Sequence, residues 1–327
     1  MKIEFPGFFD LQVNGFAGVD FNNPGCTPQQ LRHAAAAIRA TGVTQFLPTL
    51  ITSSLDTFSR CARNLLSFGD SSVAGIHMEG PYISPLDGPR GAHPCTHVIE
   101  ASIDDFKRRQ EVAEGRTLLV TLAPEVGGAL RLIEYLAASN VRVAVGHSAA
   151  TPEQIRAAIS AGATLSTHLG NGCAQDLPRH PNLIWEQLAS DELFASLIVD
   201  GHHLPPSTVK AMVRAKTPAR VILVTDAIAA AGCPPGIYQL GDSTVELSAT
   251  GRVAAPGAQN LAGSSLAMNV AVANTIRFTG LSLNDVLPMA SSLPARYVGI
   301  EPAGHVIAEW DAENFRLDVK EVVGGNV

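Results

Sequence analysis

Residues 141–168 read VRVAVGHSAATPEQIRAAISAGATLSTH, and they give the clearest indication of the fold class. Two short apolar runs, Val141–Val145 and Thr164–Thr167, flank an Ala-rich amphipathic stretch over 151–162. That stretch opens on a Thr-Pro pair, which suits a helix N-cap and first turn, and closes on Gly162, which suits a helix end. The pattern predicts strand, helix and strand in succession, which favours parallel strands.

The same alternation recurs along the whole chain. Further helices are expected over 27–42, 128–140 and 206–216, and eight strands over about 250 residues match the size of a (β/α)8 TIM barrel. The alternative is an open doubly wound sheet, but no GxGxxG fingerprint follows the first strand. The six remaining strand candidates are Phe8–Val13, Thr44–Thr49, Val73–Met78, Thr117–Leu122, Phe194–Val199 and Arg220–Thr225.

Two regions depart from this alternation. Residues 236–257 have the pattern of a β-hairpin inserted after the eighth strand. Residues 304–327 begin with two short alternating stretches, as expected for the remnant of a small β domain. We therefore expect a barrel over residues 1–303, with the hairpin as an insertion, followed by C-terminal strands.

The composition narrows the class of protein. Of 327 residues, 46% are hydrophobic and 16% charged, as expected for a well-buried globular protein. The net charge is −7 and no Lys/Arg-rich run occurs, which argues against nucleic acid or an anionic membrane as partner. Neither a signal peptide nor a membrane span is expected, and five scattered cysteines without CxxC favour a reduced, cytoplasmic protein.

Polar residues gather where the expected strands end. In a barrel these carboxyl-terminal strand ends face the active site, so their side chains should meet at one pole. A lone histidine after a strand is more often structural, but six polar strand ends are harder to dismiss. They carry Gln12 and Asn14, His77 and Glu79, His147, His168, His203, and Asp226, while His93 lies in the loop after the third strand.

These residue types define a reaction class. Glu79, His147 and His168 supply one carboxylate and two imidazoles, the set found in catalytic zinc sites that leave one position for water. Zinc lowers the pKa of its water to about 7. Asp226 is placed to take a proton from that water and pass it to a leaving group. The sequence predicts metal-assisted hydrolysis.

Several motifs carry a family resemblance. In order along residues 6–300, the chain resembles the N-acetylglucosamine-6-phosphate deacetylases of the amidohydrolase superfamily. The combined set is specific, whereas no single motif is. The motifs are PGFFDLQVNG (6–15), HMEGPYIS (77–84), GPRGAHP (88–94), VGHSAAT (145–151), THLGNG (167–172), DGHH (200–203), VTDAIAAAG (224–232) and LAGSSLAMNVAVAN (261–274).

The resemblance implies a role for each matching residue. It implies hydrolysis of the N-acetyl group of N-acetylglucosamine 6-phosphate, with the same three metal ligands and with Asp226 as general acid and base. It also implies a homodimer, because the matching arginine reaches the phosphate held by the neighbouring subunit. The implied substrate residues are His93 near the acetyl carbonyl, Asn171 and Gly172 at the sugar phosphate, His203, and Arg179 from the neighbouring subunit.

The first strand end differs from that of many amidohydrolases. Where those enzymes carry His-x-His for a second metal, this chain has Gln12 and Asn14. A carboxamide is a poor zinc ligand, so we expect one divalent ion, zinc being the first choice although iron or cobalt would accept the same ligands. Gln12 is expected to orient the substrate or a water; the alternative is that both amides only satisfy backbone groups.

The chain also departs from the family pattern. The PGFFD motif begins at residue 6, which indicates a variant lacking most of the N-terminal β domain, so the small β-sandwich domain is reduced or missing. Gly170 and the loop CAQDLPRHPN (173–182) differ from the family at the phosphate end of the pocket. Two alternatives therefore stay open: a deacetylase of another N-acyl amino sugar, free or epimeric, and a non-catalytic barrel that binds an amino-sugar phosphate.

Overall fold

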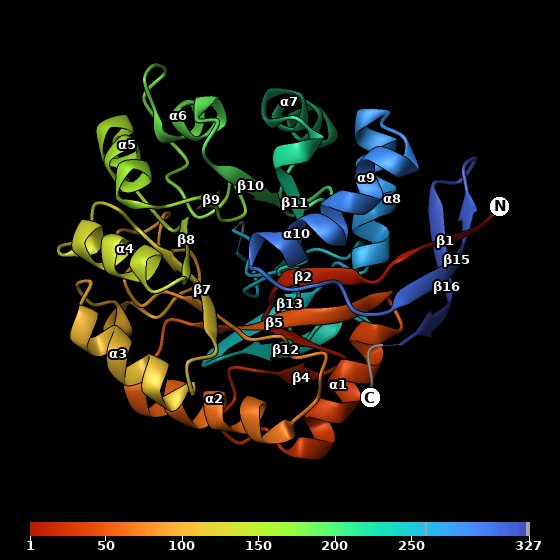
Figure 1. The fold of residues 1–327 in the computed structure, drawn as a ribbon, viewed down its shortest axis with the longest axis horizontal. Helices are drawn as coiled ribbons and strands as arrows, with labels where there is room; N and C mark the ends of the chain where they lie inside the picture. Colours follow the sequence, from red (N-terminus) through yellow and green to blue (C-terminus); the bar gives the residue numbers. More distant parts are fainter. Residues whose placement is uncertain (259, 325–327) are drawn as a thin grey trace.

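A computed structural model describes residues 1–258 and 260–324. Eight strands form one parallel sheet that curves into a nearly closed barrel, with neighbours in the order β11-β10-β9-β8-β7-β6-β5-β2 (Figure 1). The expected (β/α)8 barrel is confirmed over the open sheet. The strands are β2 (Phe8–Val13), β5 (Val43–Ile51), β6 (Ile76–Glu79), β7 (Thr117–Leu122), β8 (Arg142–Val145), β9 (Leu165–Ser166), β10 (Phe194–Leu197) and β11 (Val221–Leu223).

The first and last strands meet just beyond their ends. The amide of Asp226 donates to the carbonyl of Gln12 at 2.9 Å, and the amide of Asn14 donates to the carbonyl of Ala227 at 2.7 Å. A parallel bridge joins Val13 to Ala227. Because these bonds form at the carboxyl-terminal pole, they bring the polar end of the first strand against the polar end of the eighth.

Helices surround the strands on the outside of the barrel (Figure 1). α1 and α5 each begin with a capping box, in which Thr27 pairs with Gln30 and Thr151 with Gln154, and each has proline in its first turn. The helices are α1 (Pro28–Arg39), α2 (Leu55–Phe68), α3 (Ile103–Val112), α4 (Ala129–Ala138), α5 (Pro152–Ala161), α6 (Leu183–Ala189), α7 (Pro206–Lys216), α8 (Met268–Thr279), α9 (Leu283–Ala290) and α10 (Ser292–Tyr297), with 3-10 turns at Cys95–His97 and Pro218–Arg220.

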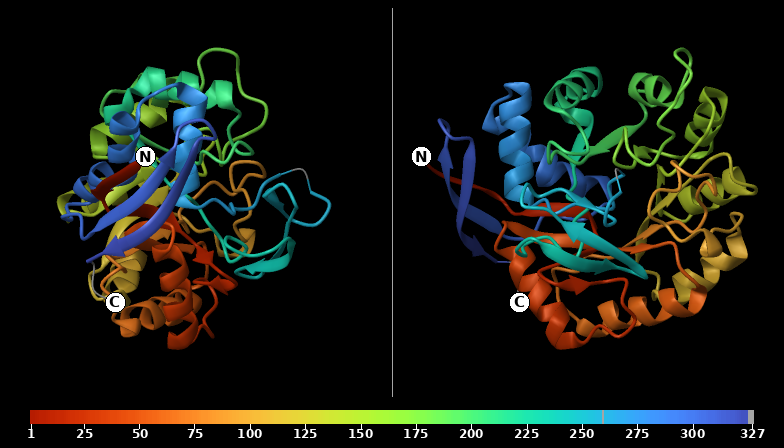
Figure 2. Two further views of the ribbon diagram at one scale, coloured as in Figure 1. Left: turned by 90° about the vertical axis from the view of Figure 1, so that its right-hand side faces the viewer. Right: turned by 180° about the vertical axis from the view of Figure 1, so that it is seen from behind.

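A small antiparallel sheet lies at the mouth of the barrel. It consists of β12 (Gly236–Leu240), β13 (Ser243–Leu247) and β14 (Val253–Ala254), within the segment expected to form a hairpin. Its apolar face packs on Ile51 and Ile228, which follow or end barrel strands at the carboxyl-terminal pole. In the right-hand view of Figure 2, which is turned by 180° from Figure 1, this sheet lies between the viewer and the barrel strands. The short strands β3 (Gly15–Phe16) and β4 (Val19–Asp20) pair nearby.

A second small sheet lies at the side of the barrel. The tail forms β15 (His305–Asp311) and β16 (Arg316–Val323), as its alternation suggested, and β1 (Lys2–Pro6) pairs with β15. These three strands form one antiparallel sheet, and its interpretation as the remnant of a small β domain stays a prediction. The pairing of Lys2–Pro6 with β15 was not predicted from the sequence, and the division of the chain at residue 303 stays a prediction.

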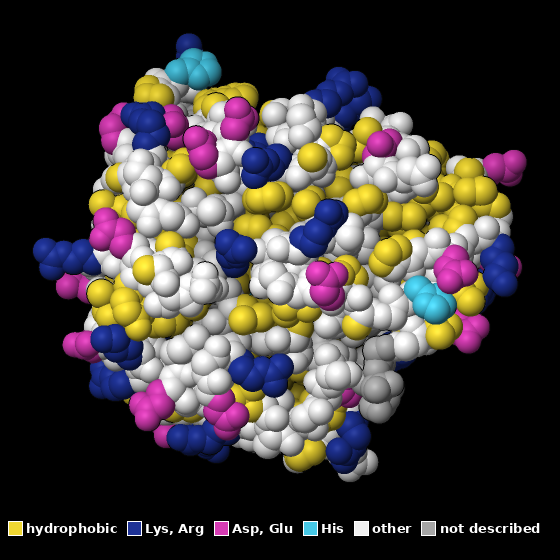
Figure 3. Space-filling model, in the orientation of Figure 1, with side chains coloured by type: hydrophobic (Ala, Val, Ile, Leu, Met, Phe, Trp, Pro, Cys, Tyr) yellow, Lys and Arg dark blue, Asp and Glu magenta, His cyan; other side chains and the backbone are white. Residues whose placement is uncertain are grey.

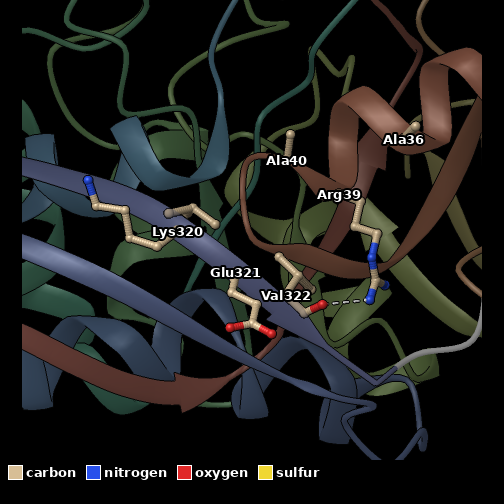
Figure 4. A pocket seen from close by; sticks show the side chains of 7 residues that line it. Ala36, Arg39, Ala40, Lys320, Glu321 and Val322 are labelled. Atoms are coloured by element: carbon tan, nitrogen blue, oxygen red, sulfur yellow. Dashed lines mark hydrogen bonds between the residues drawn. The ribbon is translucent and has the colours of Figure 1, made fainter.

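A surface hollow lies away from the strand ends. It measures about 310 Å³ and lies between α1 and β16, where the guanidinium of Arg39 donates to the carbonyl of Val322 at 3.0 Å (Figure 4). α1 leads into the amino-terminal end of β5, so this hollow is at the opposite pole from the polar residues. On the face in Figure 3, basic and acidic side chains are interspersed. Among the described residues, no helix has the length and apolarity needed to cross a membrane.

Candidate active site

Three residues from different strand ends converge at the mouth of the barrel. Oε1 of Glu79 lies 3.2 Å from Nε2 of His147 and 3.1 Å from Nε2 of His168, and the two Nε2 atoms are 3.1 Å apart. All three side chains are buried. These are the residues predicted to bind a metal, and their ligand atoms are close enough to hold one ion.

The backbone at these positions is unusual. His147, His168 and Asp226 have φ values of 50°, 30° and 50°, in the left-handed region that side-chain-bearing residues seldom adopt. Each follows the end of a strand, β8, β9 or β11, so the left-handed turn occurs where the chain leaves the barrel wall. Such a conformation costs on the order of 1–3 kcal/mol and is maintained where the surrounding structure enforces it.

The donor set fits a divalent metal. Nδ1 of His147 lies 3.0 Å from the carbonyl of Pro89, which can only accept, so Nδ1 carries the proton and the Nε2 lone pair is available at the cluster. Nδ1 of His168 is buried without a hydrogen-bond partner among the described residues. Burial raises the pKa of Glu79, but hydrogen bonds and charge from the histidines outweigh it and hold that pKa well below its usual value. The cluster therefore offers a carboxylate and imidazole nitrogens, as zinc sites do.

Asp226 is held beside this cluster by two amides from the first strand end. Nε2 of Gln12 donates to Oε1 of Glu79 at 2.9 Å and to Oδ1 of Asp226 at 3.1 Å. Nδ2 of Asn14 donates to the same Asp226 oxygen at 2.7 Å. Burial, followed by the charge of Glu79, raises the pKa of Asp226 to about 6. A carboxylate with a pKa near neutrality is suited to accept and return a proton.

His93 lies against the same cluster. Its Nε2 is 3.9 Å from Oε2 of Glu79, and its ring centroid is 4.2 Å from that of His147. Burial, together with the charge of His147, lowers the pKa of His93 to about 3, so the ring is neutral. Its Nδ1 accepts from the amide of Thr52 at 3.4 Å, which places the proton on Nε2. His93 can therefore donate a hydrogen bond to a carbonyl in the site.

The remaining predicted substrate residues divide into two groups. Asn171 and Gly172 lie three and four residues after His168. A Cβ on Gly172 would lie 3.0 Å from Nδ1 of His147. His203 donates from Nδ1 to Asp200 at 2.7 Å and lies close enough for its charge to act on Asp226. Arg179, in contrast, is exposed on the loop between β9 and α6, which projects from the molecule (Figure 2). The structure does not bring Arg179 into the site of its own chain.

Three contributors were not predicted from the sequence. Thr52 contacts His93, the carbonyl of Pro89 contacts His147, and Asp200 orients His203. Thr52 directly follows β5 and Asp200 begins the DGHH motif, so the position of each after a strand was an available signal. A backbone carbonyl such as that of Pro89 leaves no signal in residue identity.

Comparison with known proteins places the chain in a family. A family model described as "Amidohydrolase family" matches residues 3–314. The chain belongs to the amidohydrolase family. As a member it is a hydrolase, which favours an enzyme over a non-catalytic binding barrel.

Curated relatives of this amidohydrolase have related names. It is 36% identical over 301 residues to an N-acetylgalactosamine-6-phosphate deacetylase of Escherichia coli O157:H7, covering 90% of this chain and 78% of the relative. It is 32% identical over 322 residues to an N-acetylglucosamine-6-phosphate deacetylase of Lysinibacillus sphaericus, covering 97% and 82%.

A solved structure of the Mycobacterium smegmatis N-acetyl-D-glucosamine-6-phosphate deacetylase, a mutant in complex with N-acetyl-D-glucosamine 6-phosphate, superposes with a TM-score of 0.90 at 30% identity. The match covers 99% of this chain and 86% of that one.

Proposed function

We propose that this amidohydrolase removes the N-acetyl group of N-acetylglucosamine 6-phosphate, giving glucosamine 6-phosphate and acetate. The observation that carries the proposal is the convergence of Glu79, His147 and His168 beside Asp226. The likeness to the Mycobacterium smegmatis deacetylase with its bound sugar phosphate supports this substrate.

Glu79, His147 and His168 would hold one divalent metal ion, zinc being our choice. When bound, such an ion lowers the pKa of water and polarises a carbonyl. The residues of the chain do the rest. The Nε2–H of His93 donates to the acetyl carbonyl oxygen, and Asp226 takes a proton from the attacking water. Asp226 then gives that proton to the amide nitrogen, so that the amine leaves as the C–N bond breaks.

The amides of the first strand support a site for a single ion. The N–H groups of Gln12 point at both carboxylates, Glu79 and Asp226. A cation between those carboxylates would meet the positive ends of the N–H bonds. In our proposal, Gln12 thus stabilises both carboxylates by hydrogen bonds, at the position where many amidohydrolases bind a second metal.

The phosphate end of the pocket involves two subunits in our proposal. Asn171, Gly172, His203 and Gln12 line the substrate, and Arg179 reaches the phosphate bound by the other subunit of a homodimer. The exposure of Arg179 on a projecting loop supports such a reach. We further propose a cytoplasmic enzyme, in keeping with its free cysteines.

A second substrate has an observation in its favour. The Escherichia coli relative at 36% identity is named for N-acetylgalactosamine 6-phosphate, the C4 epimer. The loop over 173–182 also departs from the family at the phosphate end. A deacetylase of the epimer, or of an unphosphorylated amino sugar, is therefore the second candidate.

The test compares three substrates. We would measure acetate release from N-acetylglucosamine 6-phosphate, N-acetylgalactosamine 6-phosphate and N-acetylglucosamine, with Asp226→Asn as the inactive reference. We expect kcat/KM to be highest for the first by roughly 10-fold or more, since a well-placed charged contact is worth over 1 kcal/mol. Equal rates on the phosphorylated and free sugars would refute the phosphate assignment, and preference for the galacto sugar would establish the second candidate.

A further inference from the structure

One loop connects the metal cluster to the substrate histidine. Residues 84–93 (SPLDGPRGAH, the 84–93 loop) leave the strand that carries Glu79 and end on His93. This loop holds His147 at two points: the amide of Ser84 donates to the carbonyl of His147 at 2.9 Å, and Nδ1 of His147 donates to the carbonyl of Pro89 at 3.0 Å. A shift of the loop would therefore disturb His147 and His93 together.

The guanidinium of Arg90 ties the two ends of the loop together. Its Nε donates to the carbonyl of Pro85 at 3.3 Å, and Nη1 donates to the carbonyl of His93 at 2.8 Å. Nη2 pairs with the carboxylate of Asp87. The side chain is only 19% exposed, whereas that of Asp87 is 93% exposed. Arg90 thus stands inside the loop, and its charge partner is at the rim.

We propose that Arg90 is a positioning residue for the metal site, acting through the Pro89 carbonyl and through His93. This inference rests on the proposed role of His147 as a ligand. Without the guanidinium, the carbonyls of Pro85 and His93 lose their donor, and the turn that presents Pro89 is free to move. His147 then loses the partner that fixes its tautomer and ring orientation, which typically weakens metal binding 10–100-fold.

The chemistry of the side chain suits this role. A guanidinium is a planar fork whose donors can reach the Pro85 and His93 carbonyls and the Asp87 carboxylate at once. A lysine ammonium keeps the charge but cannot reproduce this geometry. The competing role for Arg90 is a direct contact to the substrate phosphate. The two roles differ in outcome, because a phosphate contact affects one class of substrate and leaves metal binding unchanged.

The experiment measures zinc affinity first. The dissociation constant for Zn²⁺ would be obtained by competition with a chromogenic chelator for wild type, Arg90→Met and Arg90→Lys. Arg156→Met on α5, which removes an exposed arginine paired with Glu153 and Glu186, is the matched control. We expect at least a 10-fold weaker Zn²⁺ affinity for Arg90→Met, a smaller loss for Arg90→Lys and no change for the control. Asp87→Asn keeps both carbonyl contacts and should remain within about 3-fold of wild type. If Arg90→Met does not fold, Arg90→Lys decides the matter: it should bind Zn²⁺ more weakly than Asp87→Asn, and equal affinities of these two variants would contradict the inference.

Kinetics on phosphorylated and free N-acetylglucosamine complete the test. Positioning predicts that kcat/KM falls by a similar factor on both sugars. Unchanged Zn²⁺ affinity, with or without a rise in KM confined to the phosphorylated sugar, would overturn the inference. If wild type binds Zn²⁺ but hydrolyses none of the sugars, the proposed function fails while the Zn²⁺ comparison still decides the role of Arg90. A wild type without Zn²⁺ affinity would overturn both.

Discussion

Glu79 and Asp226 share one hydrogen-bond donor, because Nε2 of Gln12 lies 2.9 Å from Oε1 of the first and 3.1 Å from Oδ1 of the second. Both carboxylates are buried, and like charges in a buried site raise each other's pKa. The amide reduces this repulsion and links the cluster to Asp226, which the amide of Asn14 also holds. In our proposal, the separation of the metal ligand Glu79 from the proton acceptor Asp226 thus depends on a neutral side chain.

Gln12→Leu should slow turnover and shift its pH dependence. A hydrogen bond from Gln12 favours the ionised form of Asp226, so loss of the amide donors raises the pKa of Asp226 relative to wild type. Asp226 must be ionised to accept a proton. The acid limb of kcat/KM should therefore move to higher pH, with kcat lower by roughly 10²-fold. The measurement is a pH–rate profile against Gln239→Leu, an exposed glutamine on β12. An acid limb at its original position would contradict this role.

Zinc should stabilise the protein through the three-residue cluster. A ligand that binds only the folded state adds about 2.7 kcal/mol to the free energy of unfolding when its concentration is 100 times its Kd. Added Zn²⁺ should therefore raise Tm by several degrees. Burial lowers the pKa of His147, but the hydrogen bond and charge of Glu79 outweigh burial and raise it. Because the ligand must be deprotonated, the zinc-induced rise in Tm should shrink as pH falls.

The variants for this measurement are His168→Asn, which should abolish the rise, and His305→Asn, a half-buried histidine on β15 outside the cluster, which should preserve it. A full zinc-induced rise in His168→Asn would show that the metal binds elsewhere.

Gly172→Ala should damage the metal site more than its backbone cost explains. Gly172 has φ 59°, and its added Cβ would lie 3.0 Å from Nδ1 of His147 and 3.2 Å from Cε1 of His168. Gly280 has φ 79° with nothing within 4 Å of such a Cβ. Both substitutions incur the left-handed penalty of about 1–2 kcal/mol, so both should lower the Tm of the metal-free protein by similar amounts. Only Gly172→Ala should weaken zinc binding, and equal zinc affinities in the two variants would contradict the contact.

Asp10→Asn should flatten the dependence of stability on pH. Burial raises the pKa of Asp10 to about 7, against the hydrogen bonds from Thr225 and Gln12. The folded state thus binds this proton more tightly than the unfolded chain. The contribution of protonated Asp10 to folding stability is therefore complete below pH 3.8 and is lost as pH rises through 7.

Urea unfolding of metal-free protein at pH 4, 5.5 and 7 provides the measurement for Asp10. As pH rises, the free energy of unfolding of wild type should fall by up to about 1.4 kcal/mol per pH unit more than that of Asp10→Asn. The exposed Asp104→Asn should behave as wild type. Parallel curves for Asp10→Asn and wild type would show that Asp10 stays ionised throughout.

Arg179 allows a test of the dimer by complementation. If Arg179 serves the neighbouring site, Arg179→Ala and Asp226→Asn are each nearly inactive alone. In a mixed dimer, the chain with intact Asp226 receives Arg179 from its neighbour, so one of two sites is complete. Random mixing should therefore recover about a quarter of wild-type activity. Mixtures that stay as inactive as their components would place Arg179 outside the neighbouring site.

The barrel could be predicted from the sequence because its strands are short apolar runs and its helix caps involve residues only a few positions apart. The sequence was less informative where paired strands lie far apart in the chain. Lys2–Pro6 pairs with His305–Asp311, and the residues near either segment do not reveal this pairing. β6 begins at Ile76 rather than Val73, since Val73 makes only an isolated bridge to Phe46. The strand-end residues of the site were predictable from position alone. The contacts of Gln12 and the Pro89 carbonyl were not, because they depend on side-chain direction in three dimensions.

The left-handed backbone at His147, His168 and Asp226 sets a conflict between durability and chemistry. Glycine adopts this conformation without steric cost, so replacement of any of the three by glycine would relieve local strain in the metal-free protein. A laboratory selection for thermal stability alone would favour glycine at these positions. The selected variants would be more stable but catalytically inactive. Selections for a tougher catalyst must therefore screen turnover in every round.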